Sequence, residues 1–210
     1  LTPIKLTIDR LKNKYSVEIE EKKKENFKEN LKIINNQINQ IEKLVNEFSD
    51  FARMPKPVFQ KNNLIVLIEE NIKLLKELDQ TINIDFIHNK QELFFEGDKE
   101  QLSRVFLNLI KNSIESIQQK TEKVSDFDKN ITIELSDFDN HISFIINDNG
   151  IGFNNLNNNI KEILNPYFTT KKEGTGLGLS IVNKIINDHN GSIEFVTKED
   201  GAKIKIVFIK

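Results

Sequence analysis

The chain has 210 residues, of which 38% are hydrophobic, and 30 Lys and Arg nearly balance 32 Asp and Glu. This balance excludes a general nucleic-acid binder, whose surface would be strongly basic, so we expect no direct nucleic-acid partner. The sequence has no Cys, which excludes disulfides and thiolate metal sites, and no apolar run approaches the ~20 residues that span a bilayer.

Apolar residues recur at helical spacing through the first quarter of the chain. A short run comprises Leu1, Ile4, Ile8, Leu11 and Tyr15, and a longer one comprises Phe27, Leu31, Ile34, Ile38, Ile41, Val45, Phe48 and Ala52. The steps of four and three predict two helices, and the charged stretch 16–26 between them predicts an antiparallel hairpin. Narrow seams bury little alone, so we expect two copies to pair into a four-helix bundle. A helical spacer packed on the rest of the chain is the alternative.

Two prolines mark a domain boundary after the second helix. Pro55 and Pro57 disfavour helical backbone in the residues that precede them. We therefore expect a hairpin domain over residues 1–54, a linker over 55–62 and a second domain over 63–210.

The second domain mixes helices and strands. The patterns predict helices at 63–78, 99–118 and 179–187, and strands at 82–87, 93–96, 131–136, 141–147, 192–197 and 203–209. Asp98 stands where it would cap the second of these helices. The elements alternate without regular strand–helix–strand units, which favours a mixed sheet with helices on one face.

Five of the eight glycines lie in two clusters, DNGIG at 148–152 and GTGLG at 174–178. The second cluster opens onto a predicted helix, whose N-terminal amides could cradle phosphate, although a flexible turn would use the same residues. In the first cluster, Asp148 ends a strand and could accept hydrogen bonds from an exocyclic amine. A strand-ending turn is the alternative, because Asp, Asn and Gly all favour turns.

Two further groups of residues could meet a nucleotide. Asn108 and Asn112 share one face of a helix, and an amide oxygen suits Mg²⁺, although an exposed polar face would look the same. In NPYFTTKK, residues 165–172, Lys171 and Lys172 could meet phosphate oxygens or form a solvated charge pair.

Together these motifs resemble a known family. N-x-x-x-N, D-x-G-x-G, PYFTTK and GTGLGL follow one another as the N, G1, F and G2 boxes do in sensor histidine kinases of the GHKL superfamily. LTPIKLTIDRLKNKY and VNEFSDFARMPKP resemble the dimerisation segment of kinases of the nitrogen-regulation NtrY type. The resemblance implies an α+β chain: a helical hairpin, half of a dimeric four-helix bundle, and then an α/β sandwich with a mixed sheet, the GHKL (Bergerat) ATP-binding fold.

The resemblance also implies roles for individual residues, with ATP and Mg²⁺ as the cofactors. Asp148 would bind the adenine amino group, and Asn112 would ligate Mg²⁺ with support from Asn108 and Lys111. A lid over residues 153–173 would cover ATP, anchored by Tyr167 and Phe168. The remaining nucleotide contacts would come from Gly150, Gly152, Thr170, Lys171, Lys172, Gly174, Thr175, Gly176, Leu177, Gly178 and Leu179.

The family's phosphoacceptor histidine stands in an H-E-x-x-N-P-L-T-P stretch, and this chain begins at the L, so we expect that histidine upstream of Leu1. His88, His141 and His189 do not match it. Ser113 replaces the usual Ala after the second Asn. Lys203 stands where the family often has a Thr near the adenine pocket.

The implied reaction moves the γ-phosphate of Mg-ATP to a histidine and then to an aspartate on a response regulator. The implied setting is the cytoplasmic portion of a membrane-anchored bacterial sensor, which forms a homodimer through residues 1–54 and acts on an NtrX-like receiver domain. One alternative is a GHKL ATPase that works as a conformational clamp, although the Glu expected to activate water is replaced by Asn108. Another is a dimerisation module with a vestigial nucleotide site.

Overall fold

The computed structural model describes residues 2–15, 21–77, 79–124, 126–153, 160–171, 174–198 and 200–210. They group into two compact units, one of residues 1–54 with 169–175 and the other of residues 55–168 with 176–210. None of the helices in this described part of the chain is both long and apolar enough to cross a membrane.

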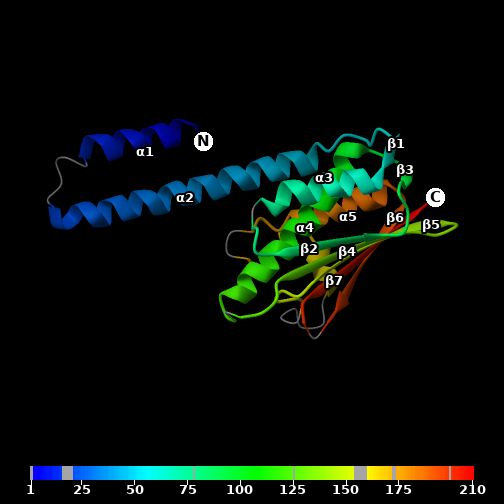
Figure 1. Ribbon diagram of the computed structural model, residues 1–210. Coiled ribbons are helices and arrows are strands. Elements are labelled where there is room, and N and C mark those ends of the chain that lie inside the picture. The colour runs from blue at the N-terminus through cyan, green and yellow to red at the C-terminus, as the bar shows by residue number, and fades with distance from the viewer. Residues whose placement is uncertain are drawn as a thin grey trace. The chain divides into compact units, whose positions relative to one another are not determined.

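The first unit contains a helical hairpin. Helices α1 (Thr2–Tyr15) and α2 (Glu21–Ala52) run side by side in opposite directions (Figure 1). Ile8 of α1 is buried against Leu31 and Ile38 of α2, with Phe27 partly buried beside them. The predicted polar connection is wrong over residues 21–26, which are helical, because Glu and Lys are good helix formers. Residues 16–20 lie outside the described residues.

Helix α1 covers only part of the apolar seam on α2. Ile34, Ile41, Val45 and Phe48 belong to the same predicted seam, yet each remains 47–52% exposed. The hairpin thus buries one edge of its apolar face and leaves the other edge accessible.

The second unit is built on a mixed sheet of five strands in the order β2-β4-β5-β7-β6. The strands are β2 (Asn83–His88), β4 (Asn130–Asp137), β5 (His141–Asp148), β6 (Gly191–Thr197) and β7 (Ala202–Ile209). Only the β2–β4 pair is parallel, and the other three pairs are antiparallel. The predicted mixed sheet is therefore confirmed.

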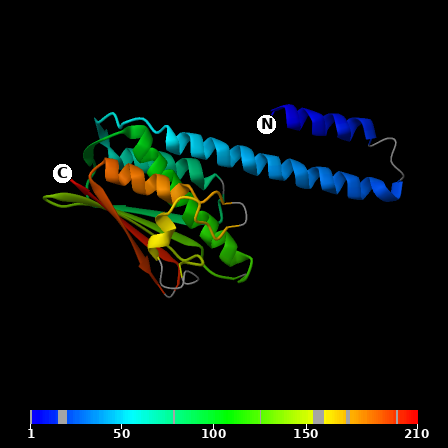
Figure 2. The same cartoon turned by 180° about the vertical axis from the view of Figure 1, so that it is seen from behind.

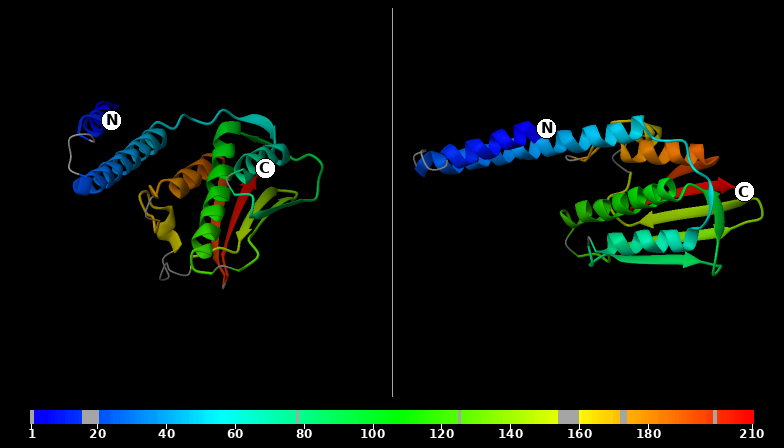
Figure 3. Two further views of the ribbon diagram at one scale, coloured as in Figure 1. Left: turned by 60° about the vertical axis from the view of Figure 1, so that its left-hand side comes forward. Right: turned by 90° about the horizontal axis from the view of Figure 1, so that it is seen from above.

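Three helices cover one face of this sheet, as Figures 2 and 3 show from two sides. They are α3 (Leu64–Lys76), α4 (Lys99–Thr121) and α5 (Gly178–Asp188). The core lies between the two layers, where Phe106 of α4 and Phe144 of β5 are fully buried with ring centroids 4.9 Å apart. Asp98 caps α4 as predicted, accepting the Gln101 backbone N–H at 3.0 Å.

Two short elements were not predicted. Strand β1 (Gln60–Asn63) pairs with β3 (Phe94–Gly97) in a separate antiparallel ribbon, and a short 3₁₀ helix, η1, spans Ile160–Leu164. The sequence QKNN of β1 has no apolar alternation, so its extended conformation depends on its pairing with β3.

Val58 and Phe59, at the beginning of the second unit, contact the start of α4 and the end of α5. The Val58 backbone N–H donates to Asp98 Oδ2 at 2.8 Å, and the Phe59 ring lies 5.1 Å from that of His189. His189 is 2% exposed; its Nε2 accepts the Asp98 N–H at 3.0 Å, and its Nδ1 donates to Ile185 O at 2.8 Å.

Candidate functional site

Asp148 ends β5 as a buried carboxylate, with only 4% of the residue exposed. Its Oδ1 accepts the Gly150 backbone N–H at 3.0 Å and the Ser116 hydroxyl at 3.4 Å. Burial raises the pKa of Asp148, while hydrogen bonds from Gly150, Ser113, Ser116 and the Ala202 backbone oppose that rise. A buried carboxylate at the end of a strand is thus held by a loop and by a neighbouring helix.

The two asparagines lie on α4, which packs against α5. Asn108 is half-buried, and its Nδ2 donates to the Arg104 carbonyl at 2.8 Å. A β-carbon placed on Gly178 would lie 3.0 Å from Asn108 Oδ1, so the start of α5 directly abuts this side chain. Asn112 is also half-buried, one turn later, whereas Lys111 is exposed and pairs with Glu115 at 3.9 Å.

The segment before α5 returns on itself. The Tyr167 N–H donates to Gly176 O at 3.0 Å. Tyr167 has a positive φ of 69°, and its residue is 53% exposed. Leu177 is fully buried and precedes α5, which begins at Gly178 rather than at the predicted Leu179. Phe168 is half-buried, and its N–H donates to Asn165 O at 3.2 Å.

Residues 169–175 group with the first unit, so the structure does not assemble them with Asp148 in one unit. Within that segment, the Lys171 N–H donates to Thr169 Oγ1 at 3.1 Å and the Gly174 N–H to Lys171 O at 3.2 Å. The Thr175 hydroxyl donates to Glu47 on α2, and Thr170 is exposed. Lys172 and residues 154–159 and 173 of the predicted lid lie outside the described residues.

Lys203 does not lie opposite Asp148 in the sheet. The register of β5 and β7 places Ala202 opposite Asp148, and Lys203 opposite Asn147. Ala202 is buried, and its backbone is among the groups that oppose the rise in the pKa of Asp148. Because neighbouring residues of a strand face opposite sides of the sheet, Lys203 points away from the face that holds Asp148. Ala202 and Ile204 are buried on either side of the half-buried Lys203, and the apolar–charged–apolar order of these residues could have indicated which face of the strand is buried.

Ser116, Gly201 and Ala202 contact Asp148 or its loop, and sequence analysis gave none of them a place in the site. Gly152 and Gly201 both have positive φ, at 65° and 82°. A β-carbon on Gly152 would lie 2.3 Å from Gly201 O, so the turn between β6 and β7 meets the loop after β5. No local pattern marks such a contact between distant turns.

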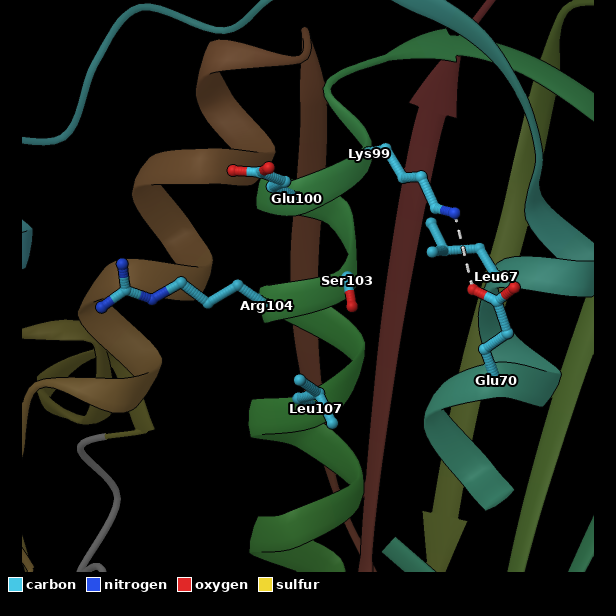
Figure 4. A pocket seen from close by; sticks show the side chains of 7 residues that line it. All are labelled: Leu67, Glu70, Lys99, Glu100, Ser103, Arg104 and Leu107. Atoms are coloured by element: carbon cyan, nitrogen blue, oxygen red, sulfur yellow. Dashed lines mark ion pairs between the residues drawn. The ribbon is translucent and has the colours of Figure 1, made fainter. Parts of the chain in front are cut away.

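An open groove of about 450 Å³ lies elsewhere, between α3 and α4 (Figure 4). It is lined by Leu67, Glu70, Lys99, Glu100, Ser103, Arg104 and Leu107, none of which belongs to the predicted site. Lys99 and Glu70 form an ion pair at 3.6 Å, and Arg104 extends from α4 on the side away from them. The groove carries charges of both signs and no buried acceptor like Asp148.

The second unit thus combines a buried acceptor at the end of a sheet strand, two asparagines on the neighbouring helix α4 and a helix, α5, that begins at a glycine against Asn108. Residues 97–210, more than half of the chain, match the family described as histidine kinase-, DNA gyrase B- and HSP90-like ATPase, and the chain belongs to that family.

Within this family, the chain is similar to sensor histidine kinases of the NtrY type. The chain is 38% identical over 209 residues to a Rickettsia prowazekii protein named as an NtrY-like sensor histidine kinase, covering 99% of this chain and 33% of the relative. It is 32% identical over 201 residues to the nitrogen regulation protein NtrY of Azorhizobium caulinodans, covering 96% of this chain and 25% of that protein. The chain thus spans about a third or less of the length of these relatives.

Solved structures agree with the fold. The catalytic domain of histidine kinase ThkA matches with a TM-score of 0.62 and 31% identity, over 73% of this chain and 98% of that one. ThkA in complex with the response regulator TrrA matches with a TM-score of 0.72 and 25% identity, over 97% of this chain and 57% of that one. The predicted GHKL fold and the resemblance to sensor histidine kinases are confirmed.

Proposed function

We propose that this chain is the dimerisation hairpin and ATP-binding domain of a protein histidine kinase in a two-component system. The whole protein transfers the γ-phosphate of Mg-ATP to a histidine upstream of Leu1 and then to an aspartate of a response regulator. The buried Asp148 carboxylate, within a family that binds ATP, is the observation that carries this proposal.

Asp148 recognises the base. A carboxylate only accepts hydrogen bonds, so it suits the exocyclic amine of adenine and disfavours a carbonyl at the same position. A buried acceptor without a donor is costly, and the loop amide of Gly150 already stabilises this one. Gly150 and Gly152 let the backbone of this loop approach the base and ribose.

Asn112 would hold the Mg²⁺ ion that accompanies ATP. Its amide oxygen is a hard ligand of the kind that Mg²⁺ prefers. Bound Mg-ATP supplies the phosphoryl group, with its charge partly neutralised by the metal. Asn108 supports Asn112 one turn earlier and lies against the start of α5, and Lys111 contributes positive charge beside them.

The segment before α5 closes over the phosphates. The backbone of Gly176, Leu177, Gly178 and Leu179 leads into the N-terminus of α5, which favours anions. Tyr167 and Phe168 anchor the end of the lid. When this lid closes, the phosphates of ATP contact Thr170, Lys171, Lys172, Gly174 and Thr175.

The hairpin pairs with a second copy. Ile34, Ile41, Val45 and Phe48 form an apolar edge of α2 that α1 leaves about half exposed. Two hairpins in a four-helix bundle would bury these edges against each other. The boundaries of this arrangement are residues 1–54 for the hairpin, 55–62 for the linker and 63–210 for the ATP-binding domain.

The partner of the phosphorylated histidine is a receiver domain. The complex of ThkA with its response regulator supports this class of partner, and the similarity to NtrY proteins favours an NtrX-like receiver. The same similarity favours a membrane-anchored sensor whose cytoplasmic portion includes this chain.

Two measurements test the proposal. The 210-residue chain should bind Mg-ATP by calorimetry, and it should gain no acid-labile phosphate from γ-labelled ATP. A longer chain that includes the upstream H-E-x-x-N-P stretch should become labelled. Stoichiometric label on His88, His141 or His189 in the 210-residue chain would refute the assignment of the acceptor.

The clamp ATPase is distinguished by the same assay. It would release inorganic phosphate steadily from ATP without forming phosphohistidine. Asn108 cannot serve as a general base for water, which disfavours that alternative. A vestigial site would show no Mg-ATP binding at all.

A further inference from the structure

We propose that Ser116 is a positioning residue of the nucleotide site, which ties the loop after β5 to α4 and holds Asp148 as the acceptor for the base. This inference rests on the proposed role of Asp148. Ser116 lies on α4, one turn after Asn112.

Ser116 makes contacts in two directions at once. Its hydroxyl donates to Asp148 Oδ1 at 3.4 Å and accepts the Ile151 backbone N–H at 3.1 Å, and its carbonyl oxygen lies 3.3 Å from the same Ile151 nitrogen. A hydroxyl has one proton and two lone pairs, so it can donate to the carboxylate while it accepts from the loop. One side chain therefore links the acceptor, the loop that follows it and the asparagine-bearing helix.

Gly150 shows how closely the loop is held to this serine. A β-carbon on Gly150 would lie 2.2 Å from Ser116 Oγ and 2.6 Å from the Ser116 carbonyl carbon. Any other residue would push the loop off α4. The Gly150 N–H also donates to Asp148 Oδ1, so Gly150 and Ser116 share one carboxylate oxygen.

The hydroxyl also favours the charged form of the acceptor. Burial raises the pKa of Asp148, and the hydrogen bond from Ser116 is one of four that oppose the rise. Two of the four come from backbone amides of Gly150 and Ala202, and one from Ser113, beside Asn112. Ser116 is the side chain among them that also holds the loop through Ile151.

The test compares Ser116→Ala with Ser116→Thr, which keeps the hydroxyl. Alanine is the better helix former, so α4 should persist in the first variant. We expect Ser116→Ala to weaken Mg-ATP binding about threefold to tenfold, the effect of one net hydrogen bond. The pH midpoint of Mg-ATP binding should also be higher in Ser116→Ala, because the Asp148 carboxyl ionises less readily when it loses a hydrogen-bond donor. Ser116→Thr should keep the wild-type pH midpoint.

A matched control and a nucleotide-free measurement separate the outcomes. Ser143→Ala removes another buried serine from the strand that carries Asp148 and should leave the midpoint unchanged. Without nucleotide, carboxyl NMR should show Asp148 titrating at higher pH in Ser116→Ala, with faster exchange of the Ile151 amide.

Unchanged titration and exchange in Ser116→Ala would overturn the role of Ser116, as would weaker binding with an unchanged midpoint. Wild-type protein that binds no Mg-ATP would instead overturn the proposed function, and this inference with it.

Discussion

The α-carbon of Gly201 lies against the backbone carbonyl of Asp148, so closely that a β-carbon on Gly201 would be 1.8 Å from that oxygen. Gly201 adopts a φ of 82°, in the turn between β6 and β7, whereas Asp148 ends β5. The peptide that carries the proposed base acceptor is therefore backed by a turn distant in sequence. Replacement of Gly201 combines a steric overlap with an unfavourable backbone conformation.

Gly201→Ala should destabilise the ATP-binding domain. A non-glycine residue in strained backbone costs about 1–3 kcal/mol, and the overlap with Asp148 adds to this. Denaturant unfolding measures the loss. Gly191→Ala is the control. A β-carbon on Gly191 would lie 2.9 Å from Val207 O, its nearest neighbour, and Gly191 has no positive φ, so this substitution should have the smaller effect. Equal effects of the two substitutions would contradict the close approach.

Asp148→Asn should weaken Mg-ATP binding by about 1.5–3 kcal/mol, since the base loses a charged hydrogen-bond acceptor. Isothermal calorimetry measures the affinity. Asp137→Asn is the control, because Asp137 lies on β4 and pairs with Lys210 and Lys90. Wild-type affinity in Asp148→Asn would remove Asp148 from the base-binding role.

The pH dependence of stability should report the same carboxyl. Burial raises the pKa of Asp148 in the folded protein, so between the unfolded value of 3.8 and the folded value the native state holds a proton that the unfolded state has lost. Stability from this group therefore falls as pH rises through that window. Asp148→Asn should gain stability relative to wild type as pH rises across it, in urea melts at several pH values. A difference independent of pH would contradict the raised pKa.

Asp137 should behave in the opposite sense. Hydrogen bonds from Lys210 and Lys90 lower its pKa, so its contribution is present above 3.8 and is lost as pH falls through the folded value. The difference in stability between wild type and Asp137→Asn should shrink in acid. The contributions of Asp148 and Asp137 to the stability of this domain should therefore depend on pH with opposite signs.

Ile41→Asp should convert a dimer into monomers, because an unpaired charge is costly to bury in a bundle interface. Ile41 is 50% exposed in the single hairpin, so the folded monomer should tolerate the change. Light scattering measures the mass, and Asn36→Asp, at an exposed polar position of α2, controls for the added charge. Ile38→Asp should instead disrupt the hairpin itself, since Ile38 is buried with Ile8. Wild-type protein that is already monomeric would contradict the interface.

His189→Phe should destabilise the domain by about 1–3 kcal/mol, because the partly buried Asp98 amide loses its acceptor. Phenylalanine keeps a ring beside Phe59 but cannot accept a hydrogen bond. Thermal unfolding measures the effect. His141→Phe, at the half-buried start of β5, should have a smaller one; equal effects would show that the hydrogen bond to Asp98 contributes little.

Strong local patterns allowed much of the fold to be predicted. Helix α4 has a cap at Asp98 and sustained apolar spacing, and β5 ends at Asp148. The order of the glycine and asparagine motifs was enough to indicate a GHKL ATP site. Elements with little periodicity of their own were missed: β1 is extended because β3 pairs with it, and residues 21–26 became helical with the rest of α2.

The sequence by itself determined the family and the candidate residues Asp148 and Asn112, because those signals are local in the chain. Only the tertiary structure decided that Ala202 rather than Lys203 lies opposite Asp148, and that Ser116 and Gly201 hold it from two sides. Strand register shifts side chains between faces one residue at a time, and close contacts join turns that are far apart in sequence. Such contacts depend on how whole layers pack, so no short stretch of sequence specifies them.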